Sequence, residues 1–248
     1  MNKLIYVSLF FLMITACNNN AKKKSLNVTV ESIDTYVAEK LDTSQNYTIL
    51  TGLRFSKEND TYAAVQFSQN DTVILCTEEH ILTSGILFRN IFYQDDLPVF
   101  VEEYEEGLTS TAEVYTERKI YFNGAAVIKA FERSAATEEE LIDMPYQEIT
   151  TTMSDFDFNK PKDAVRQQGD FEMKFGEFLI FDNQSYLVLE NENSGFNVAL
   201  FIIQGDPMID ELYSNPEKYK VKTIFTTHEF HNIAGLDRVV YTGGKIIE

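Results

Sequence analysis

AEVYTERKIYFNGAAVIKAFER, residues 112–133, contains two strand-like runs that meet at Asn123-Gly124. Asn-Gly between such runs favours a tight hairpin, because both central residues of a two-residue turn need positive φ. A turn of that length would place Ile120 opposite Val127. The stretch therefore predicts two antiparallel strands that are neighbours in one sheet.

The same period of two runs upstream of this hairpin. In TYAAVQFS, residues 61–68, alternate side chains are apolar, and Asn and Asp residues that favour turns flank the run. Residues 85–93 and 97–104 form a further pair of strand-like runs around Gln94-Asp95-Asp96. We therefore expect an antiparallel β-meander of six or seven strands.

A helix is expected before the meander, in residues 28–42. Apolar residues recur there at spacings of three and four, which places them on one face of a helix: Val30, Ile33, Val37 and Leu41. The helix and the meander together are expected to form a first domain over residues 28–133.

Residues 134–167 are expected to connect this domain to a second one. A short acidic helix is predicted at 137–143, and the remainder reads as irregular. Residues 168–248 show the order β-β-β-α-β-β, with strands expected at 171–181, 186–191, 197–203, 220–230 and 236–246. Asp206 as N-cap and Pro207 at the first helical position open the helix, whose apolar face is Met208, Ile209 and Leu212. This order resembles an OB-fold barrel, so the expected class is mainly β (α+β).

The composition excludes one class of partner. The chain has 248 residues, a formal net charge of −18 and 44% hydrophobic residues, enough for a substantial core. Nucleic-acid binding depends on Lys and Arg that neutralise phosphates, so no nucleic-acid partner is expected. Anionic lipid head groups should be repelled for the same reason.

The N-terminus, MNKLIYVSLFFLMITACNNN, has an apolar run from Leu4 to Ile14. Such a run is shorter than the roughly 20 residues that a membrane-spanning helix needs, but it suits a secretory signal. Its end, Ile14-Thr15-Ala16-Cys17, resembles the lipobox of bacterial lipoproteins. The resemblance implies a signal peptide at 1–16, a lipidated Cys17 and a tether at 17–27. The alternative is an ordinary signal peptide with an incidental cysteine.

The resemblance also implies a location in the cell envelope. Lipoproteins of this kind carry two or three acyl chains, palmitate among them, and more than one chain is needed for stable attachment. Asn18 is not the aspartate that retains such proteins in the inner membrane of enteric bacteria, and the tether lacks an acidic export cluster. We expect an outer-membrane lipoprotein that faces the periplasm and touches the membrane through Cys17.

Two residues near 75 carry separate expectations. If Cys17 is lipidated, Cys76 has no cysteine partner and is expected to be a small buried hydrophobe within TVILCT. Asp71-Thr72-Val73 resembles the short acceptor of periplasmic O-glycosylation in some Gram-negative bacteria, which makes Thr72 a candidate glycosylation site.

Two patterns suggest metal ligands but fall short of a site. His228 and His231 are three apart in a predicted strand, which would send their rings to opposite faces. Asp155, Asp157 and Asn159 match the first positions of an EF-hand, but Lys160 and Arg166 stand where Gly and Glu are required. No metal is assigned, and the candidate ligands are His228, His231, Asp155 and Asp157.

Catalysis and cofactors find little support. Glu102, Glu103, Glu105 and Glu106 are expected at a hairpin end, as a solvated face rather than an acid–base pair. No serine-hydrolase, P-loop or dinucleotide-binding motif occurs. We therefore expect no cofactor and lean toward a non-enzyme.

The leading function is a non-catalytic envelope lipoprotein that binds a protein partner or a small ligand. The alternatives are a lipid or lipoprotein carrier with an apolar half-barrel, a periplasmic hydrolase, and an immunity or inhibitor lipoprotein.

Overall fold

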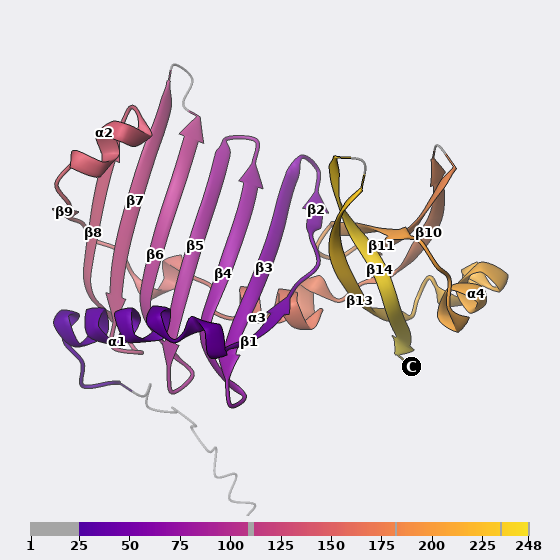
Figure 1. The fold of residues 1–248 in the computed structure, drawn as a ribbon, viewed down its shortest axis with the longest axis horizontal. Coiled ribbons are helices and arrows are strands. Elements are labelled where there is room, and N and C mark those ends of the chain that lie inside the picture. Colours follow the sequence, from indigo (N-terminus) through magenta and orange to yellow (C-terminus); the bar gives the residue numbers. More distant parts are fainter. Residues whose placement is uncertain (1–24, 109–111, 182, 234, 248) are drawn as a thin grey trace, which may run out of the picture.

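The computed structural model describes residues 25–108, 112–181, 183–233 and 235–247 (Figure 1). Cys17 and the predicted signal peptide lie outside these residues. Among the described residues, no helix combines the length and the apolar character needed to cross a membrane.

The first part is a helix followed by an antiparallel meander, as predicted. Helix α1 (Val30–Asp42) begins with a capping box between Thr29 and Ser32. The strands are β1 (Thr48–Thr51), β2 (Phe55–Lys57), β3 (Asp60–Gln69), β4 (Thr72–Leu82), β5 (Gly85–Gln94), β6 (Leu97–Leu108), β7 (Glu113–Phe122), β8 (Val127–Ala135) and β9 (Gln147–Glu148). Strands β3 to β9 pair in sequence order, and each pair is antiparallel.

Both faces of the meander are covered in part. Helix α1 crosses one face (Figure 1). Its Ile33 packs against Phe92, Phe100 and Tyr121. The segment that follows β9 covers the other face with Ile149, Met153, Phe156 and Phe158. The predicted apolar stripe of α1 is correct except for Leu41, whose side chain is 54% exposed.

The predicted register of the β7–β8 hairpin is wrong. Val127 pairs with Phe122, and Ile120 pairs with Ala130 after a bulge. The turn between the strands is therefore longer than the two residues that Asn-Gly suggested.

The side chain of Asn123 explains the longer turn. The side-chain Oδ1 accepts hydrogen bonds from the backbone N–H groups of Ala125 and Ala126 at 3.1 and 2.9 Å. The backbone N–H of Asn123 donates to the carbonyl of Ala126 at 3.1 Å. An Asn side chain that satisfies its own turn competes with the tight hairpin. Leu26 donates its N–H to the carbonyl of Asn123 at 2.6 Å, which ties the segment before α1 to this turn.

The connecting segment contains more helix than predicted. Helix α2 (Glu138–Asp143) lies where it was expected, with Thr137 as N-cap. Helix α3 (Lys160–Arg166) was not predicted. Its Pro161, Ala164 and Val165 are buried, so it is a packing element rather than a loose connection. The described residues before the barrel also form three short 3₁₀ helices: η1 (Ser44–Asn46), η2 (Met153–Asp155) and η3 (Gly169–Phe171).

The C-terminal strands close into a five-stranded ring. The elements are β10 (Lys174–Phe181), β11 (Gln184–Asn191), β12 (Phe196–Ile202), α4 (Pro207–Ser214), α5 (Pro216–Tyr219), β13 (Thr223–Ile233) and β14 (Leu236–Ile247). Pairing runs β10–β11–β12–β14–β13–β10, and only the β12–β14 contact is parallel. This ring, with α4 between its third and fourth strands, is the OB-like barrel expected from the order of elements. Asp206 accepts the N–H of Ile209 at 3.0 Å, which confirms it as the N-cap of α4.

One buried cluster joins the meander to the barrel. It contains Leu53, Phe55 and Tyr62 from the first part, Val165 from α3, and Leu187 and other interior residues of the barrel. Ser56 of β2 also pairs with Asn197 of β12. The two β parts therefore share a core.

Gly124 tests how tightly the β7–β8 turn is packed. Gly124 and Gly235 both have φ +82°, but a Cβ at Gly124 would meet the side chain of Leu97 at 2.9 Å, whereas nothing lies within 4 Å at Gly235. Alanine costs roughly 1–2 kcal/mol at either position from backbone strain alone. We expect Gly124→Ala to lower the free energy of unfolding by about 1 kcal/mol more than Gly235→Ala, as measured by urea denaturation. Equal losses would mean that Leu97 moves aside freely.

Candidate functional site

A row of five charged side chains crosses the meander on the face covered by the connecting segment. The charge row consists of Glu78, Arg89, Glu103, Arg118 and Glu132, one residue from each of β4 to β8. Each residue is the register partner of the next, so the sign of charge alternates from strand to strand. Opposite charges at directly paired positions stabilise that pairing.

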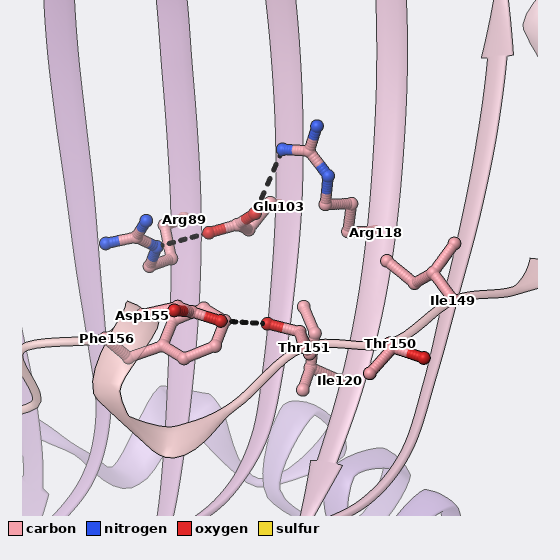
Figure 2. A pocket seen from close by; sticks show the side chains of 9 residues that line it. All are labelled: Arg89, Glu103, Arg118, Ile120, Ile149, Thr150, Thr151, Asp155 and Phe156. Carbon is pink, nitrogen blue, oxygen red and sulfur yellow. Dashed lines mark hydrogen bonds and ion pairs between the residues drawn. The ribbon is translucent and has the colours of Figure 1, made fainter.

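The ion pairs in the charge row are continuous. Arg89 contacts Glu78 through Nη1 at 3.1 Å and donates from Nε to Glu103 at 2.6 Å. Arg118 contacts the other oxygen of Glu103 at 3.4 Å and donates from Nε to Glu132 at 2.7 Å. Figure 2 shows Glu103 between the two guanidinium groups. Glu103 is therefore shared by two arginines.

The row needs these pairs because it lies against apolar packing. On each strand, the residue two positions from the charged one lies on the same face and is apolar. These five residues form the buried cluster under Phe156 and Phe158: Cys76, Ile91, Val101, Ile120 and Ala130. Glu78 and Glu103 are only 2% and 5% exposed. A buried carboxylate without a partner is strongly destabilising, so the arginines are required for the fold.

Glu78 is the most enclosed member of the row. It accepts a hydrogen bond of 2.7 Å from the hydroxyl of Tyr62, and the Nε2 of His80 lies 3.7 Å from it. Burial by itself would raise the pKa of Glu78, but His80, Arg89 and Tyr62 outweigh burial and hold that pKa below its ordinary value. Burial, together with the charge of Glu78, raises the pKa of the Tyr62 hydroxyl. Glu78 therefore stays ionised and Tyr62 stays protonated at neutral pH.

A pocket of about 340 Å³ opens beside the row. The connecting segment contributes Thr150, Thr151, Asp155 and Phe156, and the sheet contributes Arg89, Glu103 and Arg118 (Figure 2). Both arginines are already engaged by carboxylates of the sheet. The row is thus suited to holding strands in register, and it leaves no unpaired charge of its own for a ligand.

A larger pocket of about 810 Å³ lies at the junction of the meander and the barrel. We call it the junction pocket. It is lined by Lys57, Asp157, Lys160, Asp163, Gly169, Asp170, Phe171, Asn193, Ser194 and Phe196. These residues come from β2, from the segment that includes α3 and η3, and from the β11–β12 turn with the start of β12.

Two lysines give the junction pocket its hydrogen-bond donors. The ammonium of Lys160 lies 4.4 Å from the ring centroid of Tyr62, and that of Lys57 lies 6.0 Å from the ring of Phe196. Within the part of the chain that the structure describes, neither ammonium forms an ion pair. Burial lowers the pKa of Lys160, with the nearby Arg89 acting in the same direction. These two donors can serve a ligand.

Acceptors line the same pocket on a rigid frame. Asp157 accepts the N–H groups of Asn159 and Lys160 at 3.1 and 3.2 Å, which fixes the start of α3. Ser194 donates to the main-chain carbonyl of Asp170 at 2.7 Å, which ties the β11–β12 turn to η3. The carboxylates of Asp163 and Asp170 complete the lining, so the pocket offers donors and acceptors from fixed elements.

The predicted histidines do not form a site. His228 Nε2 lies 3.0 Å from the carbonyl oxygen of Gly52, and His231 Nε2 lies 2.8 Å from Glu229. The bulge in β13 falls before His228, so the spacing of three still sends the two rings to opposite faces.

The predicted aspartates act as local caps. Asp155 accepts the N–H of Thr152 and the hydroxyl of Thr151, both at 2.8 Å, and Asp157 accepts two N–H groups where α3 begins. No group of three or more His, Cys, Asp or Glu side chains suited to a metal ion occurs among the described residues. The Asp155–Asn159 pattern is accounted for by turns.

Cys76 and Thr72 lie on the same strand in different surroundings. Cys76 is fully buried, which confirms its predicted role as a small core residue, and burial raises the pKa of its thiol to about 12. Thr72 is exposed at the start of β4. Its glycosylation remains a prediction.

The expectation of a solvated hairpin end is wrong for Glu102 and Glu103, which lie in the body of the sheet. Glu105 and Glu106 lie close to the end of β6 at Leu108. Because alternate residues of a strand face opposite ways, Glu103 and Glu105 reach Arg118 on one face while Glu102 and Glu106 lie on the other. Glu103 is a buried structural carboxylate.

Comparison with models of known protein families, with curated proteins and with solved structures finds no match.

Arg89 tests the structural role of the charge row. Arg89→Met removes one of the two arginines that hold Glu103 and the arginine that pairs with Glu78, and we expect it to lower the free energy of unfolding by about 3 kcal/mol. Arg54→Met is the matched control, because Arg54 pairs with Glu79 at 3.1 Å near the surface and should cost less than about 1 kcal/mol. Similar losses for the two variants in chemical denaturation would contradict this role.

Glu78 should contribute to stability in a pH-dependent way. Because its folded-state pKa is lowered, its contribution is complete above its ordinary pKa of 4.5 and is lost as pH falls through the folded value. We expect the difference in unfolding free energy between wild type and Glu78→Gln to be largest near neutral pH and to shrink in acid. A difference that stays constant from pH 7 to pH 3 would argue against a stabilised carboxylate.

Proposed function

We propose that this chain is a lipoprotein of the bacterial cell envelope that binds a partner or a small ligand and catalyses no reaction. The observation that carries the binding role is the junction pocket, where Lys57 and Lys160 have no carboxylate partner among the described residues. A polar ligand, or a polar end of a partner chain, would accept from these lysines and donate to Asp163 and Asp170.

The membrane anchor supports the location. Ile14-Thr15-Ala16-Cys17 is the segment that resembles a lipobox, and residues 17–27 would link the acylated cysteine to α1. A net charge of −18 makes the lipid, and not the protein surface, the means of attachment. We place the protein in the outer membrane, facing the periplasm.

A binding role accounts for the charged groups better than a hydrolase does. General acid–base catalysis needs groups whose pKa values approach the working pH, whereas Glu78 is held ionised and the arginines of the row are neutralised. Ser194 is engaged with a main-chain carbonyl and has no histidine beside it in the junction pocket.

A lipid-carrier role has less support for a similar reason. Carrying a lipid requires an open apolar face. The face of the meander under the connecting segment bears the charge row instead, and α1 packs on the other face. The barrel interior is filled by Leu187, Leu189, Leu200 and Ile224. An immunity or inhibitor lipoprotein would be a special case of partner binding.

Photo-crosslinking in intact cells tests the binding role. A photoreactive phenylalanine derivative at Asn193 in the junction pocket should capture a defined adduct, either a protein seen on a gel or a small ligand seen as a mass increase. The same group at Glu217, whose side chain on α5 is exposed, is the matched position. Lys160→Met keeps the aliphatic packing on Tyr62 but removes the ammonium, so the Asn193 adduct should be lost. Absence of an adduct, or equal adducts at both positions, would count against the pocket.

The anchor is tested separately. Cys17→Ala should abolish incorporation of an alkyne-labelled fatty acid and move the protein from the membrane fraction to the soluble fraction. A variant that stays membrane-bound without the label would show that another element holds it there.

A further inference from the structure

Strand β1 presents an uncovered edge. Its residues, Thr48 to Thr51, pair with β3 on one side and are all exposed. On the other side, the backbone groups of β1 have no hydrogen-bond partner within the described ranges. Its sequence, TILT, contains no charge and no proline. Natural proteins usually block such edges, because an unpaired edge is a template for another strand.

The opposite edge of the meander, at β8, is covered by a further strand. Strand β9 pairs with β8, and Ile149 donates its N–H to the carbonyl of Ala130 at 3.0 Å. Lys129 and Glu148 form an ion pair of 3.4 Å across that edge. No equivalent cover lies on β1 among the described residues.

A groove of about 480 Å³ is lined in part by residues of β1. Its lining includes Ile49 and Leu50 of β1, Phe225 and Thr227 of β13, and Val165 of α3. Ile49 and Leu50 are 56% and 47% exposed, so the wall on the β1 side is apolar and accessible.

The backbone N–H and carbonyl of Thr226, on the β13 side of the groove, already have hydrogen-bond partners. Gln167 donates from Nε2 to the carbonyl of Thr226 at 2.7 Å and accepts the N–H of Thr226 at 3.0 Å. Its amide thus takes the place of a neighbouring strand. Just past the end of β1, His228 bonds to the carbonyl of Gly52. An added strand would therefore pair with β1 and pack its side chains against β13.

The charge of the groove selects the partner. Burial lowers the pKa of His228, which is therefore neutral at pH 7, and Arg166 is the remaining charged residue of the lining. The side chain of Arg166 forms no ion pair or hydrogen bond with any described residue. In a chain of net charge −18, an unpaired arginine beside an apolar edge favours a segment that carries a carboxylate.

We propose that β1 binds an extended, apolar segment of another protein as an added strand, with a carboxylate of that segment on Arg166. Main-chain hydrogen bonds to β1 supply affinity, and the contact with Arg166 and the apolar wall supplies selectivity. A second copy of this chain is disfavoured, because its own β1 is uncharged and its surface is acidic.

Hydrogen–deuterium exchange on the full-length, lipid-anchored protein in detergent tests the proposal. The probe is a synthetic ten-residue peptide of alternating valine and threonine with one central aspartate. The matched probe has lysine in place of the aspartate. The aspartate peptide should slow exchange of the β1 amides about tenfold at saturation, and the lysine peptide should bind roughly tenfold more weakly.

Two lysine variants distinguish binding at the β1 edge from the effect of adding a charge elsewhere on the surface. Leu50→Lys places a charge on the edge and should abolish protection of β1, whereas Leu179→Lys, at a position that is also 47% exposed, should leave it intact. Arg166→Gln should bring the two peptides to equal affinity. The proposal is overturned if β1 gains no protection at millimolar peptide, or if both peptides bind the wild type equally. Concentration-dependent dimers that protect β1 without peptide would assign the edge to a second copy instead.

Discussion

The carboxylate of Glu103, shared between Arg89 and Arg118, sets the register of the central strands. A one-residue slip of β6 would turn Glu103 to the α1 face and leave both guanidinium groups without it. The same slip would turn Val101 away from the buried cluster. The alternating charges on five strands therefore specify the strand register more strongly than the alternation of apolar residues does alone.

The covered face of the meander depends on this arrangement. Because β4 to β8 hold their register, their apolar residues line up under Phe156 and Phe158, and the connecting segment can follow the sheet toward α3. Helix α3 then places Val165 in the shared core, Lys160 at the junction pocket and Gln167 on β13. One segment thus positions the groups on which both proposed binding regions depend.

Local patterns in the sequence predict the elements, but long-range pairings decide the site. Period-two alternation, the stripe of α1 and the Asp206-Pro207 start are properties of short windows, and they predicted the helix, the meander and the barrel. Glu103 could not be recognised as buried from its window, because VEEYEEG reads as a solvated charged run until β5 and β7 supply Arg89 and Arg118. The junction pocket and α3 were missed for the same reason, since their packing partners come from both ends of the chain.

The bond between His228 and Gly52 joins residues that are 176 positions apart. Contacts of such separation are slow to form, because a long loop must close before they stabilise anything. Tyr62 and its neighbours on β2 and β3 must therefore wait for the barrel before their own packing is complete. During that interval the meander exposes the apolar residues later covered at the junction, and such transiently exposed surface is prone to aggregation.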